Sequence, residues 1–371
     1  GVVHVDGQIK GHEALSNGIP RKLGTGWNLV RNHCLSYQCS GGISTLKQVH
    51  IMQPHHSEPF AREPDTLAIV KIIRTGSELA KVSRNLSFED SRPVVVMTMG
   101  ALHEGHCSLI RKAATIGRPV LVSVFVNPTQ FAPHEDFNDY PRDLARDCKV
   151  AEDSGADLLF TPDADEIYPE GLKNATTTAQ RLKLPDVATR PGLEDAIRPN
   201  FFSGVCLVVS RLLELTKPRH CLFGEKDYQQ LLVLKDMIKD RADRFGIIEV
   251  EGAPTIRAES GLALSSRNMH LSEEQKEHAL GLRRSLEAAS TCSTIEEAQV
   301  RMRQILVEHE LDIDYAAIRD AETLTPPTKS DRPLRALVAA RLGSVRLIDN
   351  CEITLAKSMP RKDADEAPSG E

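Results

Sequence analysis

Short apolar runs alternate with stretches of helical spacing through the middle of the chain, and this alternation limits the fold more than any other feature. The runs are too short for helices and are rich in β-branched residues, so each is expected to be a buried parallel strand. They are Val94 to Val96, Val120 to Val126, Ala156 to Phe160 and the run ending at Leu222-Phe223. Helical stretches follow them at 107–117, 144–152, 204–217 and 228–240. Strands that alternate with helices predict an α/β fold, a Rossmann-like, doubly wound parallel sheet.

Changes in composition predict four parts along the chain. Residues 1–60 are rich in small and polar residues without periodicity, which favours a flexible extension. The Rossmann-like domain is expected over residues 61–251, beginning with a helical stretch from Thr66 to Val82. Residues 252–357 are expected to form a smaller α+β domain with strands at 334–340 and 345–348. The charged tail, residues 358–371, is expected to fray.

Composition excludes several classes of partner. The 371 residues carry a net charge of −6 and no long basic stripe, which argues against nucleic-acid binding. No apolar run approaches the roughly 20 residues that span a bilayer, so no membrane association is expected. The eight cysteines include no Cys-x-x-Cys pair and are expected to be reduced. The prediction is a cytoplasmic protein, and the slightly basic N-terminal extension leaves a mitochondrial destination open.

Two histidines around a glycine follow the first strand, in the segment Met99-Gly100-Ala101-Leu102-His103-Glu104-Gly105-His106. The glycine spacing is that of a Walker A loop, but His106 and Cys107 stand where lysine and a hydroxyl residue are needed. The alternative is a His-x-Gly-His turn whose imidazoles address a nucleotide triphosphate at a helix N-terminus, with Gly105 letting the backbone approach the purine. The plainer alternative is two incidental surface or core histidines.

Two later loops carry more positive charge. Gly224-Glu225-Lys226-Asp227 precedes a second helix, and Leu264-Ser265-Ser266-Arg267 adds hydroxyls and a guanidinium. Each alone is an ordinary surface loop. Together with the histidine turn they predict a triphosphate clamp. In it, Lys226, His103 and a protonated His106 are expected to stabilise the charge on the phosphoryl oxygens together with Ser265, Ser266 and Arg267.

A candidate substrate site follows the second strand. Asn127 and Gln130 emerge at its carboxyl end, where ligands bind in open α/β sheets, and Gln230 is expected to face the same crevice. A simple Asn-Pro turn is the alternative. No Gly-x-Ser-x-Gly elbow or Cys-His pair is present, so the substrate itself is expected to supply the nucleophile.

These motifs together resemble the pantoate-β-alanine ligases of the nucleotidyltransferase superfamily. The resemblance covers roughly residues 65–356 and rests on residues 98–106, 125–131, 140–142, 223–230 and 261–268. It implies a two-step reaction with ATP and Mg²⁺, in a pathway to coenzyme A. The carboxylate of pantoate attacks the α-phosphate to give pantoyl adenylate and pyrophosphate, and the amine of β-alanine then displaces AMP to give pantothenate. It also implies a homodimer and a C-terminal domain that acts as a lid.

The resemblance assigns roles to individual residues. His106 would be the catalytic acid, with His103 and Lys226 as further catalytic residues. Gln130 would contact both pantoate and β-alanine, and Gln230 pantoate; Asn127 and Arg198 are further substrate candidates. The implied nucleotide site consists of Met99, Gly100, His103, Gly105, His106, Gly224, Glu225, Lys226, Asp227, Ile256, Leu264, Ser265, Ser266 and Arg267. The metal ligands are not identified, and Asp147 is a weak candidate because a helical carboxylate is more often solvated.

Three departures from the family pattern concern loop geometry and affinity. Met97 stands where proline is usual, Ala132 where glycine is usual and Phe201 where many members have histidine. Two other functions stay open at this point. One is a cytidylyl- or adenylyltransferase that forms no amide, and the other is a nucleotide-binding scaffold without turnover.

Overall fold

The computed structural model describes residues 70–85, 92–132, 137–327 and 332–356, and the backbone of four short strands nearer the N-terminus. The chain divides into two units, Gly1–Thr66 and Leu67–Glu371. In the first unit, β1 (Trp27–His33) pairs with β4 (Val49–Pro54), and β2 (Ser36–Cys39) pairs with β3 (Gly42–Thr45), both antiparallel. The rest of the predicted extension, and the predicted tail, lie outside the described residues. The flexibility of both therefore stays a prediction.

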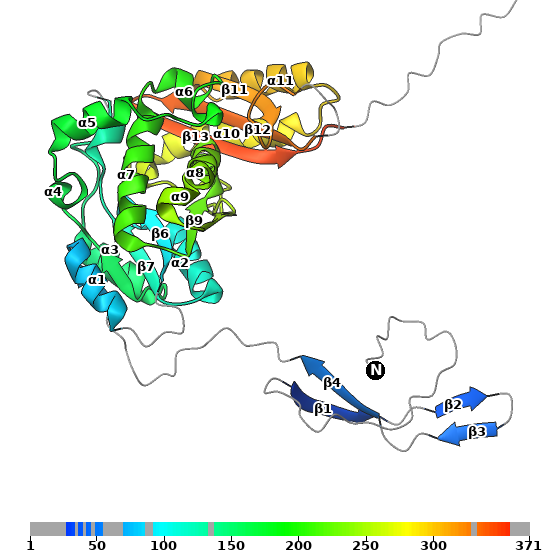
Figure 1. Ribbon diagram of the computed structural model, residues 1–371. Helices are drawn as coiled ribbons and strands as arrows, with labels where there is room; N and C mark the ends of the chain where they lie inside the picture. Colours follow the sequence, from blue (N-terminus) through cyan, green and yellow to red (C-terminus); the bar gives the residue numbers. More distant parts are fainter. Residues whose placement is uncertain are drawn as a thin grey trace, which may run out of the picture. The chain divides into compact units, whose positions relative to one another are not determined.

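A six-stranded parallel sheet organises the second unit (Figure 1). Its order is β10-β9-β6-β7-β8-β5, and every neighbouring pair is parallel. The strands are β5 (Lys71–Ile73), β6 (Val94–Thr98), β7 (Val120–Val124), β8 (Leu158–Phe160), β9 (His220–Gly224) and β10 (Glu249–Ala253). This confirms the parallel sheet that the apolar runs predict.

Helices cover both faces of this sheet. Because side chains alternate along a strand, Val95 points to one face while Val94 and Val96 point to the other. Val95 packs in a core with apolar residues of α1 (Gly76–Arg84), α7 (Phe201–Thr216) and α8 (Tyr228–Asp240). Val94 and Val96 pack in a second core with residues of α2 (Glu104–Ile116) and α3 (Leu144–Asp153). The sheet is therefore doubly wound, as expected.

Shorter helices connect these elements. They are η1 (Pro128–Gln130), α4 (Ala164–Ile167), α5 (Leu172–Gln180), η2 (Asp186–Ala188), α6 (Glu194–Ile197), η3 (Glu225–Asp227), α9 (Ala242–Phe245) and η4 (Ser266–His270). Of these, η1, η3 and η4 carry predicted site residues.

The helix predicted from Thr66 to Val82 is wrong over its first part. Lys71–Ile73 is a strand, β5, that pairs in parallel with β8 at the edge of the sheet. The helix α1 begins only after Thr75, whose side chain accepts a hydrogen bond from the backbone N–H of Glu78 in a capping box. Ile73 is buried by pairing with a strand more than 80 residues away, and a local pattern does not report such a contact. Residues 66–69 lie outside the described part of the chain.

The C-terminal part is an antiparallel sheet covered by two helices (Figure 1). The strands β11 (Asp312–Asp320), β12 (Leu334–Leu342) and β13 (Val345–Ile353) follow each other in order. They share a core with α10 (Glu273–Ala289) and α11 (Ile295–Glu308). Both predicted strands are present and longer than expected, whereas β11 was not predicted. The parallel sheet extends to Ala253, so the expected boundary after residue 251 falls inside β10.

The strand order creates a crevice beside β6. From β6 the chain proceeds through β7 and β8 on one side, then crosses to β9 and β10 on the other. The direction of winding therefore reverses between β6 and β9. In doubly wound sheets, ligands bind beyond the carboxyl ends of the strands at such a switch point. The histidine turn follows β6 and the Lys226 loop follows β9, so the fold brings both to this crevice.

Candidate active site

The histidine turn forms the N-terminal cap of α2 with its two imidazoles. Nδ1 of His103 accepts a hydrogen bond from the backbone N–H of Gly105 at 3.1 Å. Nδ1 of His106 accepts one from the backbone N–H of His103 at 3.2 Å. Because a backbone N–H can only donate, each neutral ring carries its proton on Nε2. The turn therefore presents two Nε2–H donors, and the ring centroids lie 4.1 Å apart.

Burial keeps both rings neutral. It lowers the pKa of His103 to about 4, with a further contribution from the charge of Lys226. It lowers the pKa of His106 to about 3, with a further contribution from His103. Protonation would also place an Nδ1–H against a backbone donor. The expected protonated His106 is thus a neutral hydrogen-bond donor in the structure, because the ring is removed from water.

Gly105 has a packing role in addition to the predicted approach of its backbone to a purine, which stays a prediction. A Cβ atom at this position would lie 2.9 Å from Cε1 of His103. A side chain at residue 105 would therefore push the His103 ring off the helix terminus. The close packing of the His103 ring against residue 105 therefore explains why a glycine stands there.

Asp147 of α3 holds the loop that precedes the turn. Its carboxylate accepts hydrogen bonds from the backbone N–H groups of Ala101 at 3.0 Å and Leu102 at 2.7 Å. The side chain is almost fully buried, and burial raises its pKa. Ala101 has a positive φ of 49°, a conformation that needs such support. Both oxygens are engaged by the backbone, so we interpret Asp147 as a residue that shapes the loop and do not assign it to a metal.

Asn127 and Gln130 lie at the start and end of η1, after β7. Asn127 is 1% exposed, and its amide nitrogen donates to Oε1 of Gln130 at 2.9 Å and to the carbonyl of Gly204 at 3.2 Å. Its Oδ1 accepts the hydroxyl of Tyr168 at 2.7 Å. Both the amide nitrogen and the amide oxygen of Asn127 are hydrogen-bonded within the protein. We therefore interpret Asn127 as a residue that orients Gln130. Gln130, whose Nε2 lies 3.2 Å from Sδ of Met99, is the residue that faces the crevice.

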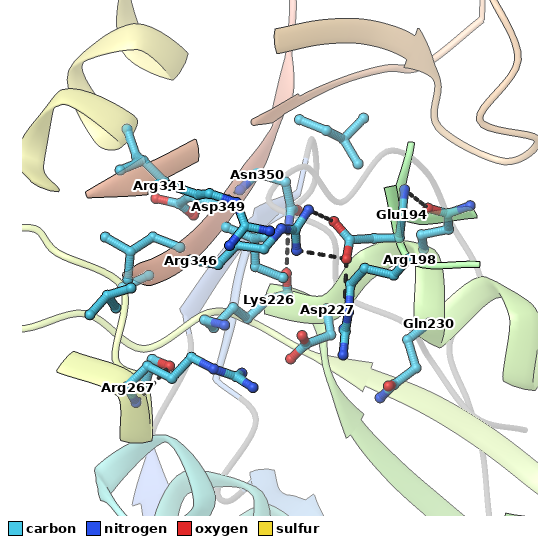
Figure 2. A pocket seen from close by; sticks show the side chains of 18 of the residues that line it. Glu194, Arg198, Lys226, Asp227, Gln230, Arg267, Arg341, Arg346, Asp349 and Asn350 are labelled. Carbon is cyan, nitrogen blue, oxygen red and sulfur yellow. Dashed lines mark hydrogen bonds and ion pairs between the residues drawn. The ribbon is translucent and has the colours of Figure 1, made fainter. Parts of the chain in front are cut away.

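A cavity of about 250 Å³ brings most of the predicted residues together. Its lining includes the predicted residues Met99, His103, Gly105, His106, Asn127, Gln130, Arg198, Gly224, Lys226, Asp227, Gln230, Ile256, Leu264, Ser265, Ser266 and Arg267. A second cavity of about 370 Å³ shares Arg198, Lys226, Asp227, Gln230, Ser265 and Arg267 with the first (Figure 2). The three loops of the predicted clamp therefore line one continuous site.

Two predicted nucleotide contacts do not line the cavity. Gly100 packs against Asp147, since a Cβ there would lie 2.8 Å from its Oδ2. Glu225 points to the C-terminal sheet, where its carboxylate pairs with Arg335 at 3.2 Å. Gly100 and Glu225 therefore contact residues outside the cavity lining, Asp147 and Arg335. The carboxylate of Glu225 is thus engaged by a partner 110 residues away in sequence, and a contact between Glu225 and the nucleotide stays a prediction.

The Lys226 loop is held by a residue that the sequence analysis missed. Asn350 of β13 donates from its amide to the carbonyls of Glu225 at 3.0 Å and Lys226 at 2.8 Å. Its Oδ1 accepts from Nε of Arg335 at 2.8 Å. No sequence motif marks Asn350, which follows the strand predicted at 345–348 and becomes buried only in the folded protein. The C-terminal sheet thus sets the backbone position of the clamp lysine.

A comparison with protein families identifies the family to which the chain belongs. The model of the family "Pantoate-beta-alanine ligase" matches residues 71–352. The chain belongs to the pantoate-beta-alanine ligase family. The matched region spans both the parallel sheet and the C-terminal sheet, so all the lining residues named above lie inside it.

Individual members of the ligase family agree with this assignment. The chain is 41% identical over 288 residues to the pantothenate synthetase of Geobacter sulfurreducens, which covers 76% of this chain and 98% of that protein. It is 45% identical over 263 residues to the pantothenate synthetase of Clostridioides difficile, covering 69% of this chain and 89% of that protein.

Solved structures of the family share the fold. Pantothenate synthetase from Thermus thermophilus superimposes with a TM-score of 0.68 at 41% identity, covering 76% of this chain and 99% of that one. The Francisella tularensis ligase "Complexed with Beta-gamma ATP and Beta-alanine" gives 0.61 at 33% identity, covering 76% and 97%. Among the described residues of this chain, no helix is long and apolar enough to cross a membrane.

Proposed function

We propose that this chain condenses (R)-pantoate with β-alanine at the expense of ATP, giving pantothenate, AMP and pyrophosphate through a pantoyl-adenylate intermediate. The observation that carries the proposal is the meeting of His103, His106, Lys226 and Gln130 in one cavity at the switch point of the sheet. Family membership and the ATP and β-alanine of the Francisella tularensis complex support it.

In the first step, the carboxylate of pantoate attacks the α-phosphorus and the bond to the pyrophosphate leaving group breaks. Negative charge then grows on the phosphoryl oxygens. Within the described part of the chain no carboxylate pairs with the ammonium of Lys226, so its charge is available to the phosphates. Two Nε2–H donors and one ammonium, placed before the reaction begins, stabilise this charge without reorganisation.

In the second step, the amine of β-alanine attacks the acyl carbon of the adenylate and AMP leaves. Both nucleophiles come from the substrates, which explains why the site needs no activated serine or cysteine. Gln130 is the polar side chain placed to orient the acids, because Asn127 fixes its Oε1 and Met99 contacts its Nε2.

Magnesium is part of the proposal. The described residues contain no group of three or more His, Cys, Asp and Glu that could hold a metal by themselves. Mg²⁺ in phosphoryl-transfer sites needs only one or two carboxylates, with phosphate oxygens and water completing the shell. Asp227 lines both cavities beside Lys226 and would supply that carboxylate. When bound, the ion would neutralise phosphate charge.

The test is a substrate-dependence assay on the full chain. Mixed with ATP, pantoate and β-alanine, the protein is expected to form AMP only when both acids are present. A stable nucleotide-linked product would contradict amide formation and favour a nucleotidyltransferase. ATP binding without release of pyrophosphate would favour a scaffold without turnover.

We also propose a cytoplasmic homodimer, which the family resemblance supports. Sedimentation analysis at micromolar concentration measures the oligomeric state. Fractionation of cells expressing the full chain measures the compartment, including the mitochondrial alternative for the N-terminal extension.

A further inference from the structure

Glu194, the first residue of α6, is a buried carboxylate shared by two parts of the molecule. It is 6% exposed and accepts hydrogen bonds from Nη1 and Nη2 of Arg346 at 2.8 and 2.7 Å (Figure 2). It also accepts the hydroxyl of Tyr315 at 2.8 Å. Burial raises the pKa of Tyr315 well above its ordinary value, so this hydroxyl remains a donor. Arg346 lies on β13 and Tyr315 on β11, so both of these close side-chain donors to Glu194 come from the C-terminal sheet.

Arg198 lies on the other side of the same carboxylate. Its Nη1 is 3.9 Å from Oε2 of Glu194, a longer separation than that of Arg346 (Figure 2). Its Nη2 is 3.5 Å from the carbonyl of Gln130, and its guanidinium lies 3.7 Å above the ring of Phe201. Arg198 lines both cavities. Two arginines, one at the substrate site and one on the C-terminal sheet, therefore compete for one carboxylate.

We propose that Glu194 is a positioning residue for Arg198. The pairing of Glu194 with Arg346 determines whether Arg198 stays beside Gln130 or moves toward Glu194. With the C-terminal sheet packed against α6, Arg346 and Tyr315 neutralise Glu194, and Arg198 stays beside Gln130 to bind the carboxylate of an acid substrate. Arg346 is also held by Asp314 at 2.6 Å, which keeps it at this place. The inference rests on the proposed function, because it assigns Arg198 to an acid substrate.

The charge balance gives the direction of the effect. Without Arg346, Glu194 would be a buried carboxylate with Arg198 as its neighbouring cation, and an uncompensated buried charge is strongly unfavourable. Arg198 would then move toward Glu194 and away from Gln130. If Glu194 is made neutral at the same time, the attraction of Glu194 for Arg198 is removed. If the contact between Glu194 and Arg346 were purely structural, the opposite is expected. Replacing both residues would then impair the protein more than replacing Arg346 alone.

The experiment compares R346Q with the double variant E194Q/R346Q in the full chain. R346Q is expected to raise KM for pantoate or β-alanine about tenfold or more, with KM for ATP within about threefold of the original. E194Q/R346Q is expected to restore the KM for that acid to within about threefold. R332Q is the matched control, because Arg332 precedes β12, pairs with Asp320 and Glu322, and lines neither cavity. It is expected to change either KM by less than about threefold.

Two results would overturn the inference. One is an equal rise in KM for ATP and for the acids in R346Q, and the other is a double variant as impaired as R346Q or worse. Thermal unfolding of each variant verifies that it is folded. If R346Q does not fold, R346K keeps the charge but loses the paired contact, so a smaller rise in the KM for the acid is expected, and E194Q is again expected to reverse it. Failure of the original chain to form AMP from both acids would contradict the proposed function instead.

Discussion

The backbone N–H of His103 donates to Nδ1 of His106, and this bond places the proton of the His106 ring on Nε2. The ring therefore has two separable tasks. Nδ1 closes the N-terminus of α2, and Nε2–H remains as a donor on a ring that lines the cavity of the proposed nucleotide site. Substitutions that keep one task and remove the other distinguish the role in folding from the role in catalysis.

His106→Asn tests the donor. The asparagine oxygen can replace Nδ1 as the acceptor for the His103 N–H, but no group replaces Nε2–H. We expect pyrophosphate release with pantoate and ATP to fall about 100- to 1000-fold, the usual loss for one preorganised donor. The melting temperature should change little. His106→Ala should lower both activity and stability, and near-normal pyrophosphate release by His106→Asn would refute the assigned role.

The lowered pKa values predict how stability depends on pH. Between pH 6.5 and 5, unfolded histidines near their ordinary pKa bind protons, whereas His103 and His106 in the folded protein stay neutral. The unfolded state then binds more protons, so the free energy of unfolding falls as the pH falls, by roughly 1 to 2 kcal/mol for each histidine. Urea unfolding at pH 7, 6 and 5 measures this. The double variant His103→Asn with His106→Asn should show a smaller slope, and an equal slope would show that the rings are not buried neutral.

Asp147→Asn tests the loop before the turn. Asparagine keeps one acceptor but turns an NH₂ group toward the N–H of Ala101 or Leu102, so one buried donor loses its partner. We expect a loss of about 1 to 3 kcal/mol in the free energy of unfolding and a higher KM for ATP. The control is Asp153→Asn on the same helix, an exposed residue paired with Lys149, which should change stability by less than about 1 kcal/mol. Equal effects of the two variants would contradict the role given to Asp147.

Gly204→Ala tests how Gln130 is positioned. A Cβ at residue 204 would lie 2.3 Å from the carbonyl oxygen of Thr129, so η1 must move away from α7. We expect kcat/KM for pantoate to fall about tenfold and stability to fall by about 1 to 3 kcal/mol. Ser203→Ala, one residue earlier on the same helix, is the control because it adds no atom. Unchanged kinetics in Gly204→Ala would show that η1 tolerates the shift.

Asn350→Asp tests the link from the C-terminal sheet to Lys226. The carboxylate would face the carbonyls of Glu225 and Lys226, to which the amide now donates. We expect KM for ATP to rise and kcat to fall, each about tenfold, because the clamp lysine moves. Glu352→Gln, an exposed residue on the same strand, should have no measurable effect. A change in melting temperature alone, with normal kinetics, would leave Asn350 a purely structural residue.

Much of the site was predictable from local sequence. The alternation of strand and helix and the His-x-Gly-His turn were identified from spacing, and the two loops at Lys226 and Arg267 from their residue types in combination with that turn. This worked because a strand end, a turn and a helix start are set by neighbouring residues. The roles of β5, Glu225 and Asn127 were not predictable in this way, since each depends on a partner far along the chain.

The sequence by itself determined a doubly wound sheet and the loops that reach its carboxyl edge, because periodicity and turn chemistry are local properties. Only the tertiary structure decided that both histidines are neutral, because their pKa values depend on burial by distant segments. It also decided that Asn350 holds Lys226 and that Arg346 holds Glu194, across separations of 124 and 152 residues. Desolvation and long-range pairing exist only once the chain has folded.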